Sequence, residues 1–95
     1  MSSNLQLTDE DLAGTFSELD NQVKAVRDAK LLMEKKQLEV VARKQYKKAR
    51  TALSAFNSEI KKCDDAVQKN VFSKKFASYE ERLKAADKEL KDQIH

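Results

Sequence analysis

The sequence predicts an all-α protein, either an antiparallel helical hairpin or a three-helix bundle with coiled-coil packing. The 95 residues include no proline and one glycine, so residues that interrupt helices are nearly absent. Charged residues make up 37% of the chain and aromatic residues 6%, which leaves too little bulk for a thick globular core. In the centre, mainly apolar residues recur at alternating steps of three and four, the spacing of a helical seam that faces a partner helix. This seam consists of Tyr46, Ala49, Leu53, Phe56, Ile60, Cys63, Val67 and Asn70.

The first helix is predicted to begin at Thr8. Thr8 can cap the helix, and the acids from Asp9 to Asp11 complement the positive end of the helix dipole. Thr15 offers a second start, because Gly14 costs about 1 kcal/mol relative to alanine inside a helix. The apolar stripe of this helix runs through Leu12, Phe16, Leu19, Val23, Val26, Met33 and Val40, with Lys30 and Gln37 interrupting it.

The apolar stripes change phase twice along the chain. Between Leu38 and Tyr46 the register slips, which permits a bend without requiring one, because this stretch contains good helix formers and no glycine or proline. The second change, at residues 69–73, is the predicted reversal. A competing break at Asn57 and Ser58 is rejected because the seam continues through it. The stripe after the reversal consists of Phe76, Tyr79, Leu83, Ala86 and Leu90.

At the predicted reversal, Asn70 tolerates a left-handed backbone and Ser73 can cap the last helix. Ser78 is an equally good cap one turn later. The resulting organisation is a flexible N-terminus at residues 1–7, followed by one helical domain over residues 8–95 that reverses near 69–73.

Charge is strongly segregated along the chain, although the net formal charge is only +3. Residues 1–23 contain five acids and no base, residues 24–50 contain ten bases and three acids, and residues 51–95 are nearly balanced, with nine bases and eight acids. An acidic start and a basic centre favour antiparallel pairing with a neighbour, or attraction of an acidic partner to the centre.

The basic centre is the best candidate for an electrostatic function. Clustered bases bind phosphates, so the alternative partners are nucleic acid and an anionic membrane surface. The competing interpretation is a solvated helix flank, and no aromatic platform for bases accompanies the charge. The candidate residues for this alternative are Lys36, Arg43, Lys44, Lys47 and Arg50, within a cluster that also includes Lys35 and Lys48.

Catalytic, metal-binding and cofactor-binding residues are not predicted. The one histidine, His95, is the last residue, and no nucleophile with a base or glycine-rich loop accompanies it. Cys63 occupies a seam position and is expected to act as core filler. The acidic clusters lack the ligand spacing of a calcium loop. We therefore expect no enzyme activity, no cofactor, no metal and no small-molecule substrate.

A run beginning at Phe16 has the order Phe16, Ser17, Glu18, Leu19 and then Val23, followed by a polar helical stretch and the basic residues Arg43 and Lys44. This run resembles the first helix of prefoldin subunits of the beta type and covers about a third of the chain. Residues 67–72 fall about where those subunits place a short hairpin, and residues 73–94 resemble the returning helix. The resemblance implies a helical-hairpin chaperone subunit that assembles with others and grips unfolded clients.

The sequence thus predicts a non-enzymatic coiled-coil interaction or assembly subunit, a scaffold that serves a larger complex. Its expected partner is another helical chain, or itself as a homo-oligomer. The uncharged stretches are too short for a bilayer span, and the first residues do not resemble a targeting peptide, so we expect an intracellular, cytoplasmic protein. The predicted partner-binding residues are Leu53, Phe56, Ile60 and Val67.

Overall fold

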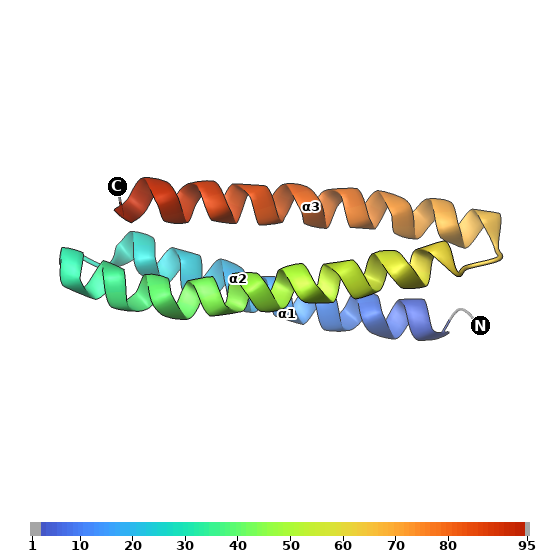
Figure 1. Cartoon of the computed structure of the whole chain (residues 1–95), viewed down its shortest axis with the longest axis horizontal. Helices are drawn as coiled ribbons and strands as arrows, with labels where there is room; N and C mark the ends of the chain where they lie inside the picture. The colour runs from blue at the N-terminus through green and yellow to red at the C-terminus, as the bar shows by residue number, and fades with distance from the viewer. Residues whose placement is uncertain (1–2, 95) are drawn as a thin grey trace.

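The computed structural model describes residues 3–94, which form three α-helices and no strand. These are α1 (Ser3–Asp28), α2 (Leu32–Lys61) and α3 (Ala66–Ile94). Successive helices run antiparallel, so that α1 and α3 point the same way (Figure 1). The all-α prediction is confirmed, and of the two predicted arrangements the three-helix bundle is the one observed.

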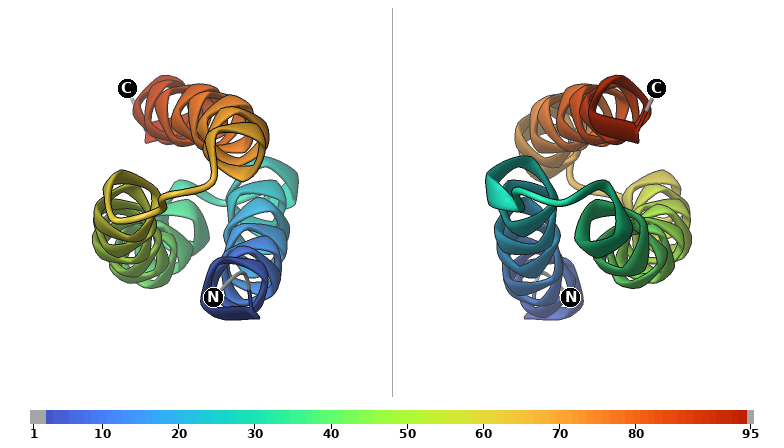
Figure 2. Two further views of the ribbon diagram at one scale, coloured as in Figure 1. Left: turned by 90° about the vertical axis from the view of Figure 1, so that its right-hand side faces the viewer. Right: turned by 90° about the vertical axis from the view of Figure 1, so that its left-hand side faces the viewer.

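The bundle is long and narrow, with extents of 50 × 18 × 16 Å. A helix of 30 residues is about 45 Å long at about 1.5 Å per residue, so each helix runs nearly the whole length of the bundle. Seen along the long axis, the three helices occupy the corners of a triangle (Figure 2). Each helix therefore turns one side towards the other two and the opposite side outward.

The core is formed by the inward sides of all three helices. The apolar stripes predicted from sequence supply most of it, because a buried helix face repeats every three to four residues. The three helices of a single chain thus bury one another's apolar stripes. The buried side chains are Leu5, Leu12, Phe16, Leu19, Val23, Val26, Ala42, Ala49, Leu53, Phe56, Ile60, Tyr79, Leu83, Ala86 and Leu90.

Aromatic rings from the three helices meet inside the bundle. Phe16 of α1 stacks on Tyr79 of α3, with ring centroids 4.8 Å apart. Phe56 of α2 makes edge contacts with Tyr79 at 6.2 Å and with Phe72 at 6.0 Å. The Tyr79 hydroxyl donates a hydrogen bond of 2.9 Å to Oδ1 of Asp9. Burial, together with this bond and the charge of Asp9, raises the pKa of Tyr79 to about 12.

The first helix begins earlier than predicted. Residues 3–7 belong to α1 and the side chain of Leu5 is buried, so the predicted start at Thr8 is wrong, as is the prediction of a flexible terminus for residues 3–7. Met1 and Ser2, the rest of that prediction, lie outside the described residues. Thr15 is also inside the helix, where its hydroxyl donates to the carbonyl of Asp11 at 2.9 Å.

The first reversal lies at residues 29–31, at an interruption of the first stripe. A helix that continued through this point would place Lys30 on the buried seam, where an unpaired charge is costly. The reversal avoids this, and it also removes the next residues of the stripe from the core. Met33 and Val40 are 73% and 53% exposed on α2, so their predicted place in the core is wrong.

The second reversal lies at Lys62–Asp65 and not at residues 69–73, which are helical. Asp65 caps α3, because its Oδ1 accepts hydrogen bonds from the backbone N–H groups of Val67 at 2.9 Å and Gln68 at 3.3 Å. The prediction near 69–73 is therefore wrong. The physical reason is that Asp65 supplies the cap expected from Ser73.

The stripe of α3 also begins earlier than the sequence indicated. Phe72 already packs against the core, so the chain must reverse before that residue. Val67, expected to continue the central seam, lies beyond the turn and is 73% exposed. The predicted seam therefore ends in the second turn, where Cys63 still packs against the core.

Candidate interaction surface

The predicted partner-binding residues lie mostly in the interior of the bundle. Leu53, Phe56 and Ile60 are buried on α2 by the other two helices of the same chain. Val67 is exposed on the first turn of α3. The structure therefore does not bring the four residues together on one accessible surface.

Arg43, a member of the predicted basic site, is engaged by two carboxylates. Its Nη1 donates to Oδ1 of Asp87 on α3 at 2.6 Å, and its Nε donates to Oε1 of Glu39 at 3.0 Å. The hydrogen bond from Arg43, followed by that from Lys91, lowers the pKa of Asp87. The bond to Asp87 is also the largest cause that raises the pKa of Arg43. Arg43 thus ties α2 to α3.

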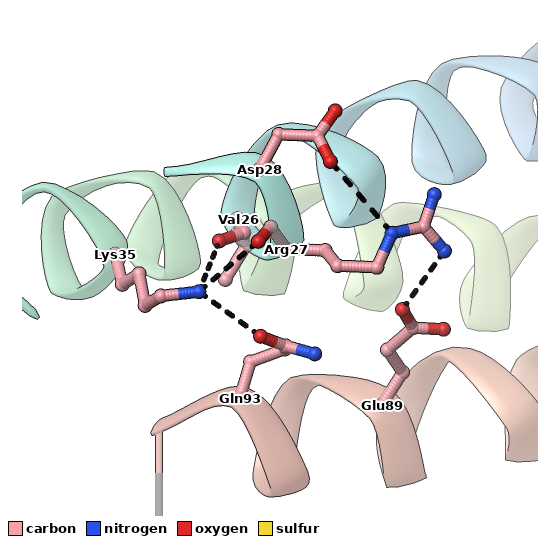
Figure 3. Close-up of polar contacts among 6 residues, drawn as sticks. All are labelled: Val26, Arg27, Asp28, Lys35, Glu89 and Gln93. Carbon is pink, nitrogen blue, oxygen red and sulfur yellow. Dashed lines mark hydrogen bonds and ion pairs between the residues drawn. The ribbon is translucent and has the colours of Figure 1, made fainter. Parts of the chain in front are cut away.

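Lys35 has a structural role at the end of α1 (Figure 3). Its Nζ donates to the backbone carbonyls of Val26 and Arg27, each at 3.1 Å, and to Oε1 of Gln93 at 3.0 Å. A cation is favourable here, because the last carbonyls of a helix lack intrahelical partners and carry partial negative charge. Nearby, Arg27 pairs with Glu89 of α3 at 3.2 Å. Lys35 thus joins all three helices at this end.

The remaining lysines of the basic centre have no such partners. Within residues 3–94, no hydrogen bond or ion pair engages the ammonium groups of Lys36, Lys44, Lys47 or Lys48. Arg50 is exposed and lines the groove between α2 and α3. The acidic first helix does not neutralise these lysines, because within residues 3–94 no ion pair joins an acid of α1 to α2.

Two acids of α1 pair with bases of α3. Asp9 accepts from Nζ of Lys75, and Asp20 accepts from Nη2 of Arg82, both at 2.7 Å. Over its length α1 carries six acids and two bases, whereas α2 carries eight bases and three acids. The outward side of α2 is therefore the basic side of the bundle.

Large apolar side chains are exposed in the same part of α2. Met33 and Val40 each precede a buried alanine, Ala42 or Ala49, by nine residues. Nine residues make about two and a half helical turns, so the two apolar residues lie on the side opposite the core. Val41 is 48% exposed beside them. At the adjoining end of the bundle, Leu31 and Leu32 are 65% and 55% exposed.

We define the docking face as a set of seven exposed residues of α2 that lie between Met33 and Lys48. At about 100° per residue these positions fall within an arc of about 140° around the helix. No carboxylate lies on this arc: Glu34 borders it, and Glu39 is bonded to Arg43. The docking face consists of Met33, Lys36, Val40, Val41, Lys44, Lys47 and Lys48.

The grooves between the helices are weaker candidates for a functional site. The groove between α2 and α3 has a volume of about 240 Å³ and is lined by Tyr46, Leu53 and Phe76 among others. Ligand pockets usually measure about 300–1,000 Å³ and enclose most of the ligand. A groove of about 420 Å³ lies between α1 and α3, but charged residues such as Asp20 and Arg82 line it. The docking face is thus the more distinctive feature.

Residues with catalytic or ligand chemistry are few. His95 lies outside the described residues. Cys63 is half-buried in the second turn, 3.5 Å from the carbonyl oxygen of Asp65. In the part of the chain that the structure describes, no three histidine, cysteine or acidic side chains are grouped as a metal site would require. Nor does any helix within residues 3–94 have the length and apolar character needed to cross a membrane.

The sequence analysis identified the lysines of the docking face but not its apolar part. Val41 was assigned no role, and Met33 and Val40 were assigned to the core. The available signal was the run from Leu31 to Met33 beside Lys30, because three consecutive apolar residues cannot all face one core. In comparisons with protein-family models, curated proteins and solved structures, no match to this chain was found.

Proposed function

We propose that this chain is a non-enzymatic interaction module, a three-helix bundle that binds a negatively charged partner through the docking face of α2. The observation that carries this proposal is the concentration of unpaired lysines and exposed apolar side chains on one arc that lacks carboxylates. Unpaired bases attract anionic partners, and exposed apolar groups gain free energy when the partner covers them.

The expected assembly through a coiled-coil seam has less support. Leu53, Phe56 and Ile60 would become available to another helix only if the bundle opened, and the core would then lose its central contacts. Assembly as a prefoldin-like chaperone subunit is in the same position, because the helices that would reach a neighbour are packed on one another. Docking through the outer side of α2 leaves the core intact.

The proposal is tested with three anionic probes: vesicles containing phosphatidylserine, a DNA duplex and polyglutamate. At least one should bind at about 50 mM salt and lose most of its affinity by about 200 mM, because salt screens exposed charges. A variant with Lys36, Lys44, Lys47 and Lys48 replaced by glutamine should weaken that binding strongly. Since an exposed lysine near an anionic surface contributes about 1 kcal/mol, each replacement is worth about fivefold in affinity.

The matched control changes four exposed lysines of α3 to glutamine and so removes the same net charge. These control positions are Lys69, Lys74, Lys84 and Lys88. If the two quadruple variants lose affinity equally, only net charge matters and the docking face is refuted. Absence of binding to all three probes at low salt contradicts the whole proposal. Circular dichroism checks that both variants remain helical.

A further inference from the structure

We propose that the negatively charged partner is a lipid bilayer with anionic headgroups, on which α2 lies flat with Met33, Val40 and Val41 inserted among the headgroups. This inference rests on the proposed function and names the partner of the same face.

The shape of the face suits a fluid partner. Met33 and Val40 project from the convex outer side of a helix, opposite the buried Ala42 and Ala49. A folded protein would need a matching groove to cover such a ridge, whereas a bilayer interface accommodates the apolar side of a helix that lies in its plane. Because α2 runs along the long axis of the bundle (Figure 1), the whole face can touch a flat surface at once.

The docking face is long enough to contact a flat bilayer surface along several helical turns. From Met33 to Lys48 the helix rises by about 22 Å at about 1.5 Å per residue. Leu31 and Leu32 extend the apolar area at the end of the bundle, where they are more than half exposed. A bundle lying on its side would place Met33, Val40 and Val41 towards the same surface, whereas Leu32 lies about 100° around the helix from Met33.

The charges of the bundle would orient it on an anionic bilayer. At about 100° per residue, Lys36 and Lys47 lie beside Val40, whereas Lys44 and Lys48 lie between Met33 and Val41. The long stems of lysine allow the ammonium groups to remain at headgroup level while the apolar neighbours insert. The acid-rich α1 occupies another corner of the triangle (Figure 2), so its outer side is turned away from a surface that α2 contacts. Electrostatic attraction and apolar insertion thus favour one orientation.

Nucleic acid fits the same face less well. The six aromatic rings of the chain lie within the core or pack against it, so none is presented beside the lysines as a stacking platform for bases. A duplex would be bound by its phosphates alone, which gives the exposed apolar residues no role. The rings are Phe16, Phe56 and Tyr79 in the core, with Tyr46, Phe72 and Phe76 packed against it.

Insertion can be observed directly, because the chain contains no tryptophan. In Val40→Trp the single tryptophan should shift its fluorescence to the blue when vesicles of phosphatidylcholine and phosphatidylserine are added, and not with phosphatidylcholine alone. Val67→Trp is the control, since Val67 is exposed on α3 at the other end of the bundle from the start of α2. A blue shift of equal size in both variants contradicts the proposed orientation.

Vesicle flotation then measures the part played by the apolar side chains. Combined Met33→Ser and Val40→Ser substitutions should weaken binding about tenfold or more, because each removes apolar surface that the bilayer covers. Combined Val67→Ser and Val71→Ser substitutions remove exposed apolar residues from α3 and should leave binding unchanged.

The outcomes separate this inference from the proposed function. Binding to anionic vesicles that requires Met33 and Val40 and gives the Val40→Trp shift supports both. The alternative outcome is that the protein binds vesicles, the DNA duplex and polyglutamate with similar affinity, shows no effect of the Met33 and Val40 substitutions, and gives no fluorescence shift in Val40→Trp. In that case the docking face binds by charge alone. That result overturns the membrane inference and leaves the proposed function standing. No binding to any of the probes overturns both.

Discussion

Replacing Phe56 by alanine should destabilise the isolated chain by about 3–5 kcal/mol, the usual cost of truncating a buried phenylalanine. Phe56 is fully buried, and its ring makes edge contacts with Phe72 and Tyr79 at 6.0 and 6.2 Å. The cost combines lost burial of apolar surface, the cavity left behind and two aromatic contacts worth about 0.5–1.5 kcal/mol each. Because native domains are stable by only about 5–15 kcal/mol, the variant should be close to unfolding.

Urea unfolding followed by circular dichroism, at low and high protein concentration, measures this loss. The wild-type midpoint should not depend on concentration, because one chain supplies the whole core around Phe56. Phe76→Ala is the matched control and should cost less, since Phe76 is only partly buried. Phe56→Leu gives a milder change if the alanine variant does not fold. A loss below about 1 kcal/mol, or a midpoint that rises with concentration, would refute the reasoning.

Three further predictions concern the turns and the buried tyrosine. Asp65→Ala should lower the free energy of unfolding by about 0.5–2 kcal/mol, because the α3 cap is lost. Asp64→Ala is the control, and equal losses from the two variants in urea titrations would contradict the capping role of Asp65. Leu32→Pro should leave the bundle folded, as measured by circular dichroism. Leu31 has the extended backbone (φ −99°, ψ 139°) preferred before proline, and Leu32 is the first residue of α2, where proline is tolerated. A loss of about 3 kcal/mol, typical of proline inside a helix, would instead show that α1 and α2 are continuous in solution. The pKa of Tyr79 is raised from 10.0 to about 12, so the unfolded chain loses this proton first. The stability contributed by neutral Tyr79, about 2–3 kcal/mol, should therefore be complete below about pH 10 and lost as the pH rises to about 12. Urea midpoints across this range should fall less steeply in Tyr79→Phe than in the wild type, and equal slopes would contradict the assignment.

The helical stripes were predictable because their signal is local and repeats along the chain. The run from Leu12 to Val26, the central residues from Leu53 to Ile60 and the last stripe from Tyr79 to Leu90 all occupy the core. The turns were harder to predict, because residues 29–31 are Ala, Lys and Leu, all acceptable in a helix. Phase changes in the stripes show that a break exists, but both reversals, at 29–31 and at 62–65, lie before the phase changes at 38–46 and 69–73.

The docking face was only partly predictable from the sequence, because a base can pair with an acid that is distant along the chain. Lys36, Lys44 and Lys47 were identified from composition, and they share one side of α2 in the structure. Arg43 belongs to the same cluster in sequence, yet Asp87, which lies 44 residues away, binds it. Sequence spacing could not distinguish a paired base from an unpaired one when the partner is distant.

By itself, the sequence determined that the chain is helical, that each helix has one apolar stripe and that bases gather in its middle third, because spacing and charge are properties of neighbouring residues. Only the tertiary structure decided which charges remain unpaired. Asp9 is bound by Lys75 and Asp20 by Arg82, across 66 and 62 residues of sequence. Since these bases of α3 bind the acids of α1, and the turn at 29–31 places Met33 and Val40 opposite the core, α2 presents its lysines and apolar side chains on one outer face.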